Sequence, residues 1–199
     1  IRKGEYEGMN EKILLDDWLP DYGSKFNKKS GVTAIGVREF LIAYNVNLNT
    51  SDKKLASDIA LDIREAGRAK RDKNGKIIRD NENKIIKVPG SLKSVKGVGW
   101  YLEEHNIAQV SMNLVNYKET SLHETFEEVR KQAVKRGLRV TGSELVGLIP
   151  LNALLDAGKF YLKKQNKSTG VTDEQLIHIA VKSLGLDEMY NFINKEKII

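Results

Sequence analysis

Two stretches of the chain alternate between apolar and polar positions, which is the pattern of a half-buried β-strand. In residues 40–48 one row is fully apolar: Phe40, Ile42, Tyr44, Val46 and Leu48. In residues 107–117 the core row is Ala108, Val110, Met112 and Leu114. Residues 92–102 and 138–149 give two further candidate strands. The pattern therefore predicts a sheet of four strands.

Helical periodicity and capping residues separate these strands. A helix over residues 51–66 begins with Ser51 as its cap and ends before Gly67. Another helix begins at a capping box formed by Ser121 and Glu124. The resulting β-α-β-β-α-β order predicts an α+β, ferredoxin-like fold, in which two helices cover one face of a four-stranded antiparallel sheet.

Further helices are expected on both sides of this repeat. Residues 4–15 form a short amphipathic candidate, followed by an irregular stretch up to Gly31 that resembles a linker. Toward the other end, Pro150 opens one helix, and Thr172 with Gln175 caps another. These C-terminal helices would be an appendix to the sheet.

The polar rows of the two alternating strands consist of neutral amides and a hydroxyl, whereas charged side chains are usual on a solvated face. They are Asn45, Asn47, Gln109, Ser111 and Asn113. A buried amide without a partner would cost about 1–3 kcal/mol. One interpretation is cross-strand amide pairing at a domain interface. The other is one wall of a binding site for a polar heterocycle.

Composition narrows the kinds of chemistry to expect. The 199 residues are 40% apolar and 30% charged, which is typical of a packed globular chain. Cysteine is absent and His105, His123 and His178 are scattered, so neither thiol chemistry nor a metal site is expected.

The N-terminal residues are too acidic for a signal peptide and no apolar run is long enough for a membrane span, so we expect a cytoplasmic protein without membrane contact. The first residue is Ile1, which indicates processing or a piece of a longer protein.

The net charge of +6 arises in one region, because residues 51–100 carry 13 basic and 7 acidic side chains while the rest of the chain is balanced. Within it, a turn followed by Lys-Ile-Ile occurs twice, and Asn74-Gly75 is a strong turn signal. We expect residues 70–88 to form a hairpin-like surface excursion. It is either a solvated loop or a rim that attracts anionic ligands.

The segment Lys96-Gly-Val-Gly-Trp-Tyr101 resembles the aromatic strand signature of RNA-recognition modules, which share the β-α-β-β-α-β order. That signature has an aromatic residue where Val98 stands, and amides replace its stacking rings. Nucleic acid is therefore not the expected partner.

Four longer segments resemble a known enzyme family: Gly31–Leu48, Gly97–Glu104, Ala108–Leu114 and Gly142–Leu151. They are similar to glutamate formiminotransferase, the folate enzyme of histidine degradation, within the formiminotransferase-cyclodeaminase family. The resemblance runs along the whole chain. It implies transfer of a formimino group from N-formimino-L-glutamate to N5 of tetrahydrofolate, the co-substrate, without a metal.

In that family, two subdomains enclose folate in a tunnel. The resemblance places the tail of the first subdomain and a linker in residues 1–31, and the second subdomain in residues 32–199. The family's general base is a histidine of the first subdomain, which would precede Ile1, and none of the three histidines here matches it. We therefore expect no catalytic residue in this chain, which alone should be inactive and would act with the missing N-terminal subdomain.

The resemblance also implies which residues contact folate. A family loop between two glycines falls on Gly23, Ser24, Lys25, Phe26, Asn27, Lys28, Lys29, Ser30 and Gly31. Its phenylalanine can stack on an aromatic ring and its lysines can meet glutamate carboxylates, although an ordinary interdomain linker is the alternative. Arg38 is a candidate carboxylate clamp. The amide row becomes the second wall of the tunnel, and the basic stretch would favour polyglutamyl tails.

Three alternatives stay open. The donor can carry a formyl group, since N-formylglutamate is also a one-carbon derivative of glutamate. The chain can instead be a non-catalytic module that binds a folate, an amino acid or RNA. The sequence is also compatible with a homodimer.

Overall fold

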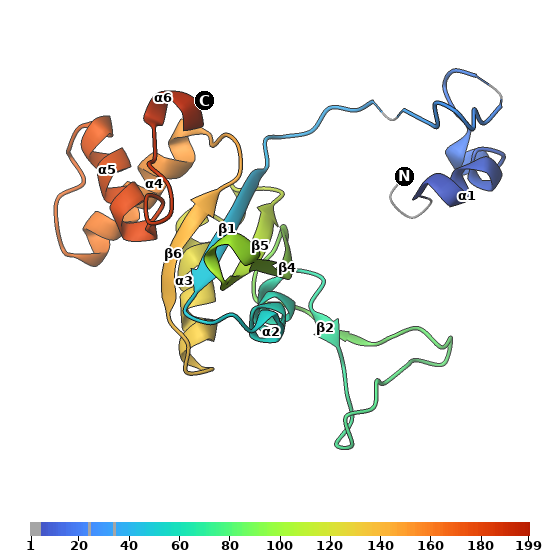
Figure 1. Cartoon of the computed structure of the whole chain (residues 1–199), viewed down its shortest axis with the longest axis horizontal. Helices are drawn as coiled ribbons and strands as arrows, with labels where there is room; N and C mark the ends of the chain where they lie inside the picture. The colour runs from blue at the N-terminus through green and yellow to red at the C-terminus, as the bar shows by residue number, and fades with distance from the viewer. Residues whose placement is uncertain (1–4, 24, 34) are drawn as a thin grey trace. The chain divides into compact units, whose positions relative to one another are not determined.

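The computed structural model describes residues 5–23, 25–33 and 35–199, and the chain divides into two compact units, Ile1–Arg38 and Glu39–Ile199 (Figure 1). The first unit contains helix α1 (Glu5–Lys12) and the short 3-10 helix η1 (Asp16–Trp18). Met9 and Ile13 are buried within it. The helix expected over residues 4–15 is therefore present but ends earlier.

The second unit is built on one four-stranded sheet. Its strands are β1 (Ile42–Leu48), β4 (Val95–Leu102), β5 (Ile107–Leu114) and β6 (Val140–Leu145). The strand order is β4-β5-β1-β6, and each neighbouring pair is antiparallel. The unit's helices are α2 (Lys53–Ile63), the 3-10 helix η2 (Glu103–His105), α3 (Leu122–Val134), α4 (Leu151–Lys164), α5 (Asp173–Leu184) and α6 (Asn194–Lys197). The α+β class and the four-stranded antiparallel sheet are confirmed.

The core lies between the sheet and helices α2 and α3. Helix α2 packs against β4 and β5, and α3 packs against β1 and β6. Both predicted apolar rows are buried from Ile42 to Leu48 and from Ala108 to Leu114, where they meet residues such as Ile59 of α2. Full burial of one such side chain is worth about 1.5–3 kcal/mol, so these rows decide which sheet face is closed.

No helix among the described residues has the length and apolar character needed to cross a membrane.

Several predicted element ends were wrong. Phe40 is 63% exposed and precedes β1, so the apolar row begins at Ile42. Helix α2 is capped by Asp52, not Ser51, because the Asp52 carboxylate accepts the N–H of Lys54 at 2.8 Å. It ends at Ile63, before the turn that contains Gly67.

The observed starts of helices α3, α4 and α5 agree better with the starts predicted from the sequence. Pro150 stands one position earlier than predicted, as the residue that caps α4. The capping boxes that begin α3 at Ser121 and α5 at Thr172 are both confirmed.

Residues 70–88 form the expected hairpin-like excursion (Figure 1). Its base is a ribbon of two short strands, β2 (Arg68–Ala69) and β3 (Lys87–Val88). Beyond the ribbon, the repeat seen in the sequence is also a structural repeat. The carboxylates of Asp72 and Asp80 each accept a backbone N–H from four residues further along, at 2.9 Å.

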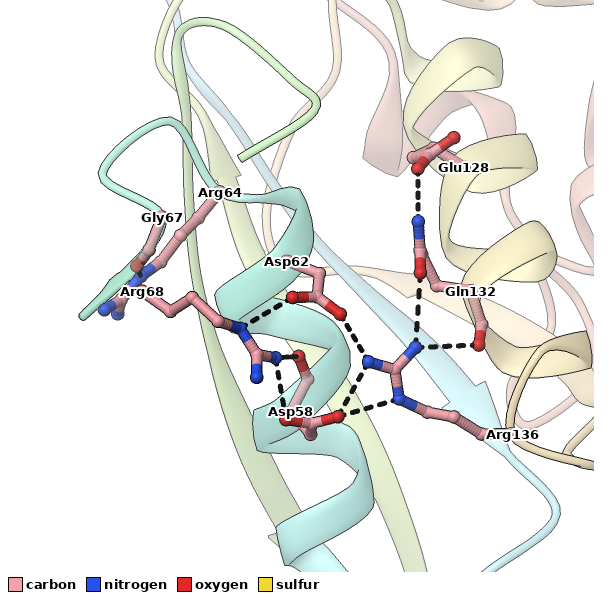
Figure 2. A network of polar contacts seen from close by, with 8 residues as sticks. All are labelled: Asp58, Asp62, Arg64, Gly67, Arg68, Glu128, Gln132 and Arg136. Atoms are coloured by element: carbon pink, nitrogen blue, oxygen red, sulfur yellow. Dashed lines mark hydrogen bonds and ion pairs between the residues drawn. The ribbon is translucent and has the colours of Figure 1, made fainter. Parts of the chain in front are cut away.

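Figure 2 shows the polar network that attaches this excursion to the helices. Arg136, which follows α3, donates to Asp58 Oδ2 at 2.7 and 2.9 Å and also pairs with Asp62. Arg68 of β2 pairs with the same two carboxylates at 2.7 and 2.6 Å. Burial alone would raise the pKa of Asp58, but the hydrogen bonds from Arg136 and Arg68 outweigh burial and hold that pKa below its usual value.

Candidate functional site

The five predicted amide and hydroxyl side chains share one face of the sheet. Strand pairing places Asn45 opposite Ser111 and Asn47 opposite Gln109, and Asn113 lies next along β5 on the same side. Directly opposite residues of antiparallel strands point to the same face. We call this surface the polar face; it also includes the residues of β4 and β6 that pair with these five.

Helix α2 covers the other face of the sheet. Gly99 of β4 lies so close to α2 that a Cβ would come within 2.3 Å of Ser57 N. Because side chains alternate along a strand, Val98 and Trp100 point the opposite way, and they pair with Ser111 and Gln109. These two side chains are 54% and 52% exposed. The polar face is therefore not beneath α2, and an exposed indole borders it.

One end of the polar face is closed by side-chain hydrogen bonds. Gln109 Nε2 donates to Asn47 Oδ1 at 2.8 Å, and both side chains are buried. Asn47 Nδ2 in turn donates to Glu188 Oε2 at 3.1 Å and lies 2.9 Å from Met189 Sδ. Asn47 and Gln109 thus form a cross-strand amide pair, whereas the domain interface expected with such pairing stays a prediction.

The polar face also has an acidic member that sequence patterns do not reveal, Glu144 of β6. Strand pairing places it opposite Asn45. Its Oε2 accepts hydrogen bonds from Asn45 Nδ2 at 3.4 Å and from Gln109 Nε2 at 3.3 Å. Residues 140–145 show no regular alternation of apolar and polar positions, so only the pairing register of β6 with β1 reveals which neighbours Glu144 has.

The other end of the polar face is open. Asn45 and Ser111 are half-buried and Asn113 is exposed. Val98 pairs with Ser111, and Trp100 lies one pair further along β4, opposite Gln109. The open end therefore offers hydrogen-bond donors and acceptors near an apolar, aromatic surface. This combination can bind a planar, polar ring.

The predicted loop at residues 23–31 lies in the first unit and contains an ordered turn. Asn27 Oδ1 accepts the backbone N–H groups of Lys29 and Ser30 at 2.9 and 3.1 Å, and Asn27 O accepts that of Gly31 at 2.7 Å. Gly23 has a φ of +79°, a conformation that favours glycine.

Most of the other candidate residues of the first unit are exposed at the surface. Lys25, Lys28 and Lys29 are exposed and Phe26 is half-buried, while Ser24 lies outside the described residues. Arg38 is exposed at the end of the first unit. The amide row belongs to the second unit, so a shared site between the two groups stays a prediction.

Two of the histidines contact other aromatic side chains, and the third is exposed. His105 Nε2 lies 3.1 Å from the hydroxyl of Tyr190. His123 stacks on Phe160 with ring centroids 4.3 Å apart, and burial lowers its pKa. His178 is exposed on α5. None of them stands on the polar face.

A large hollow lies elsewhere, beside α3, with a volume of about 1230 Å³. Acidic and basic side chains line it together, and several of them pair with one another. Arg130 lies 2.7 Å from Glu127, and Lys131 lies 3.3 Å from Glu128. Because these charges compensate one another, the hollow offers no distinctive chemistry for a ligand. Among the described residues there is also no group of three or more His, Asp or Glu that could hold a metal ion.

Comparisons of the sequence with a family model and with known proteins agree with one another. Residues 43–199 match the family model described as "Formiminotransferase domain". Over its whole length the chain is 47% identical to formimidoyltransferase-cyclodeaminase of Mus musculus and 46% identical to that of Dictyostelium discoideum. Over 83% of its length it is 41% identical to glutamate formimidoyltransferase of Streptococcus pyogenes serotype M1.

The chain covers only part of each relative. It spans 34% of the mouse and Dictyostelium proteins and 48% of the streptococcal protein. The family match begins at residue 43, the second residue of β1, and includes the rest of the sheet with its polar face. By this match, the chain belongs to the formiminotransferase-domain family.

Proposed function

We propose that this chain is the folate-contacting part of a glutamate formimidoyltransferase. The proposed enzyme moves a formimino group from N-formimino-L-glutamate to N5 of tetrahydrofolate in histidine degradation, in the cytoplasm. Membership of the formiminotransferase-domain family supports the reaction class. The observation that carries the proposal is the open part of the polar face, where Asn45, Ser111 and Asn113 line the surface and Trp100 lies one pair further along β4, opposite Gln109.

This surface matches the chemistry of a reduced pterin. The pterin ring is planar and presents several N–H donors together with ring-nitrogen and carbonyl acceptors. Asn45 and Asn113 each offer a donor and an acceptor, and Ser111 offers both in one hydroxyl. Trp100 offers an apolar surface for the ring. The bonded pair Asn47 and Gln109 would hold the two central strands in register beside the ligand.

The charged part of folate needs cations beyond Lys96, the basic residue that the strand register places on the polar face. Arg38 and the lysines of the loop at residues 23–31 are the candidates for the glutamate carboxylates, as predicted from the sequence. The basic excursion at residues 70–88 is a candidate for the extra carboxylates of polyglutamyl tails. All of these are exposed, so they are accessible to an anionic ligand.

In the proposed reaction, N5 of tetrahydrofolate attacks the formimino carbon. The new N5–C bond replaces the bond between that carbon and the glutamate nitrogen, and the proton of N5 passes to the departing glutamate amine. A base must accept that proton, and hydrogen-bond partners must stabilise the tetrahedral centre. This chain would supply the binding surface, and the N-terminal part of the domain would supply the base.

Calorimetric titration with 5-formyltetrahydrofolate tests the proposal. It should be done with the chain alone and with the N-terminal subdomain added in trans. Replacing both Asn45 and Asn113 by alanine should weaken binding by about tenfold or more, because two hydrogen bonds of about 0.5–1.5 kcal/mol each are lost. Asn152→Ala, on the exposed side of α4, is the matched control.

The outcomes separate the possibilities. Unchanged affinity in the double variant would assign the polar face to packing. Absence of binding by the unmodified chain, even with the N-terminal subdomain present, would refute the proposed function.

A further inference from the structure

A carboxylate on the polar face has no counter-charge in the described structure. Only Oε2 of Glu144 receives hydrogen bonds, from the amides of Asn45 and Gln109, and both bonds are long at 3.4 and 3.3 Å. Among the described residues, no Lys, Arg or His forms an ion pair with Glu144, and no donor bonds its Oε1. One oxygen of this half-buried group is therefore available to a ligand.

The surroundings of Glu144 increase its preference for a cation. Glu188 adds a second carboxylate to the same end of the polar face, bonded to Asn47. The basic residue that the strand register places on this face is Lys96 of β4, whose partner is Asn113 at the open end. Removing a carboxylate from water without a counter-charge is costly, so a cationic N–H donor would be favoured here.

The two candidate donors differ at the group that would meet Glu144. A formimidoyl group is an amidine, which at neutral pH is a planar cation with N–H donors at the end of the group. It can meet a carboxylate as a guanidinium does, through short, charge-assisted hydrogen bonds. A formyl group is neutral and places a carbonyl oxygen at that position. This oxygen would face the carboxylate oxygen with no proton between them.

Building on the proposed function, we propose that Glu144 is the specificity-determining residue that binds the formimidoyl group of the donor and discriminates against the formyl group. Asn45 and Gln109 hold the carboxylate through Oε2, and Oε1 receives the amidinium N–H. The polar face then binds both partners of the transfer, the pterin at its open end and the cationic one-carbon group at Glu144. The two positions adjoin because Asn45 borders both.

The test is Glu144→Gln in the complete formiminotransferase domain. Glutamine keeps an oxygen that accepts from Asn45 and Gln109 but removes the charge. The value of kcat/KM for N-formimino-L-glutamate should fall by about 10- to 100-fold, the range expected for losing a hydrogen bond to a charged group. The inhibition constant of N-formyl-L-glutamate against this donor should stay the same or improve. The affinity for 5-formyltetrahydrofolate should change by less than about twofold, since neutral pterin contacts are kept.

Glu188→Gln is the matched control, because it removes the same charge from the other side of Asn47. It should change the preference between the two donors much less than Glu144→Gln does, because Glu188 bonds Asn47 and adds only its charge to the site. An equal shift in both variants would contradict a specific role for Glu144 and indicate a general field effect.

An unchanged preference between the two donors in Glu144→Gln would also overturn the inference. This holds whether both donors lose equally, neither donor loses, or only the affinity for folate falls. Failure of the proposed function itself would look different, because the unmodified complete domain would then transfer nothing from N-formimino-L-glutamate.

Discussion

Replacing Gly99 by alanine tests which face of the sheet α2 covers. The added Cβ would lie 2.3 Å from both N and Oγ of Ser57, whereas ordinary contacts begin at 3.4 Å. The hydroxyl can rotate away, but the nitrogen belongs to the backbone of α2. Helix and strand must therefore separate by about 1 Å.

Overpacking of this kind typically costs about 1–3 kcal/mol. Because a rigid backbone atom is involved, we expect the upper end of this range for Gly99→Ala. In a chain of this size, about 3 kcal/mol corresponds to a Tm lower by about 6–12 °C. Thermal and urea unfolding followed by far-UV circular dichroism measures the loss.

Gly97→Ala is the matched control on the same strand and the same face. Its Cβ would lie 3.5 Å from Met112 Cγ and 3.7 Å from Ala60 Cβ, which is ordinary contact. This variant should be neutral or gain about 0.4–1 kcal/mol, because alanine restricts the unfolded chain. Equal stability of Gly99→Ala and the unmodified chain, or a greater loss in Gly97→Ala, would refute the packing of α2 on this face.

Two further predictions concern the helices. Arg136→Gln should lower the free energy of unfolding by about 1 kcal/mol at pH 7, because Asp58 and Asp62 lose a partner but are partly screened by solvent. The folded-state pKa of Asp58 is depressed, so its stabilising contribution is present above about pH 4 and lost as the pH falls through the lowered value. Urea titrations at pH 7 and pH 3 should therefore bring variant and unmodified chain closer together at pH 3, and a wider gap there would contradict the network. Asp52→Ala should cost about 1 kcal/mol by removing the cap of α2, whereas Ser51→Ala should cost nothing; the reverse order of urea midpoints would show that Ser51 is the cap after all.

The sheet and its closed face could be predicted from the sequence because strand periodicity is local. Alternation in β1 and β5 identified both buried rows, and the capping box at Ser121 identified the start of α3. The ends of helices and strands are harder to predict from the sequence. Ser51 and Asp52 are both good caps, and only the backbone geometry selects Asp52.

The candidate site was predictable only in part, because its members come from distant segments. Asn45 and Gln109 could be found by their row, but Glu144 becomes their neighbour only through the register of β6. The closure of Asn47 depends on Glu188, which lies 141 residues away along the chain. Short-range patterns carry no information about contacts at this separation.

Binding of the pterin by the polar face can be tested directly by NMR. The side-chain amide resonances of Asn45, Asn113 and Gln109 are observed while 5-formyltetrahydrofolate is added. The titration should use the chain with its N-terminal subdomain present. The signals of Asn45 and Asn113 should shift most, together with the indole N–H of Trp100, while those of Gln132 on α3 should stay unchanged. Shifts confined to α3 and its neighbours, with the polar face unaffected, would contradict this mode of pterin binding.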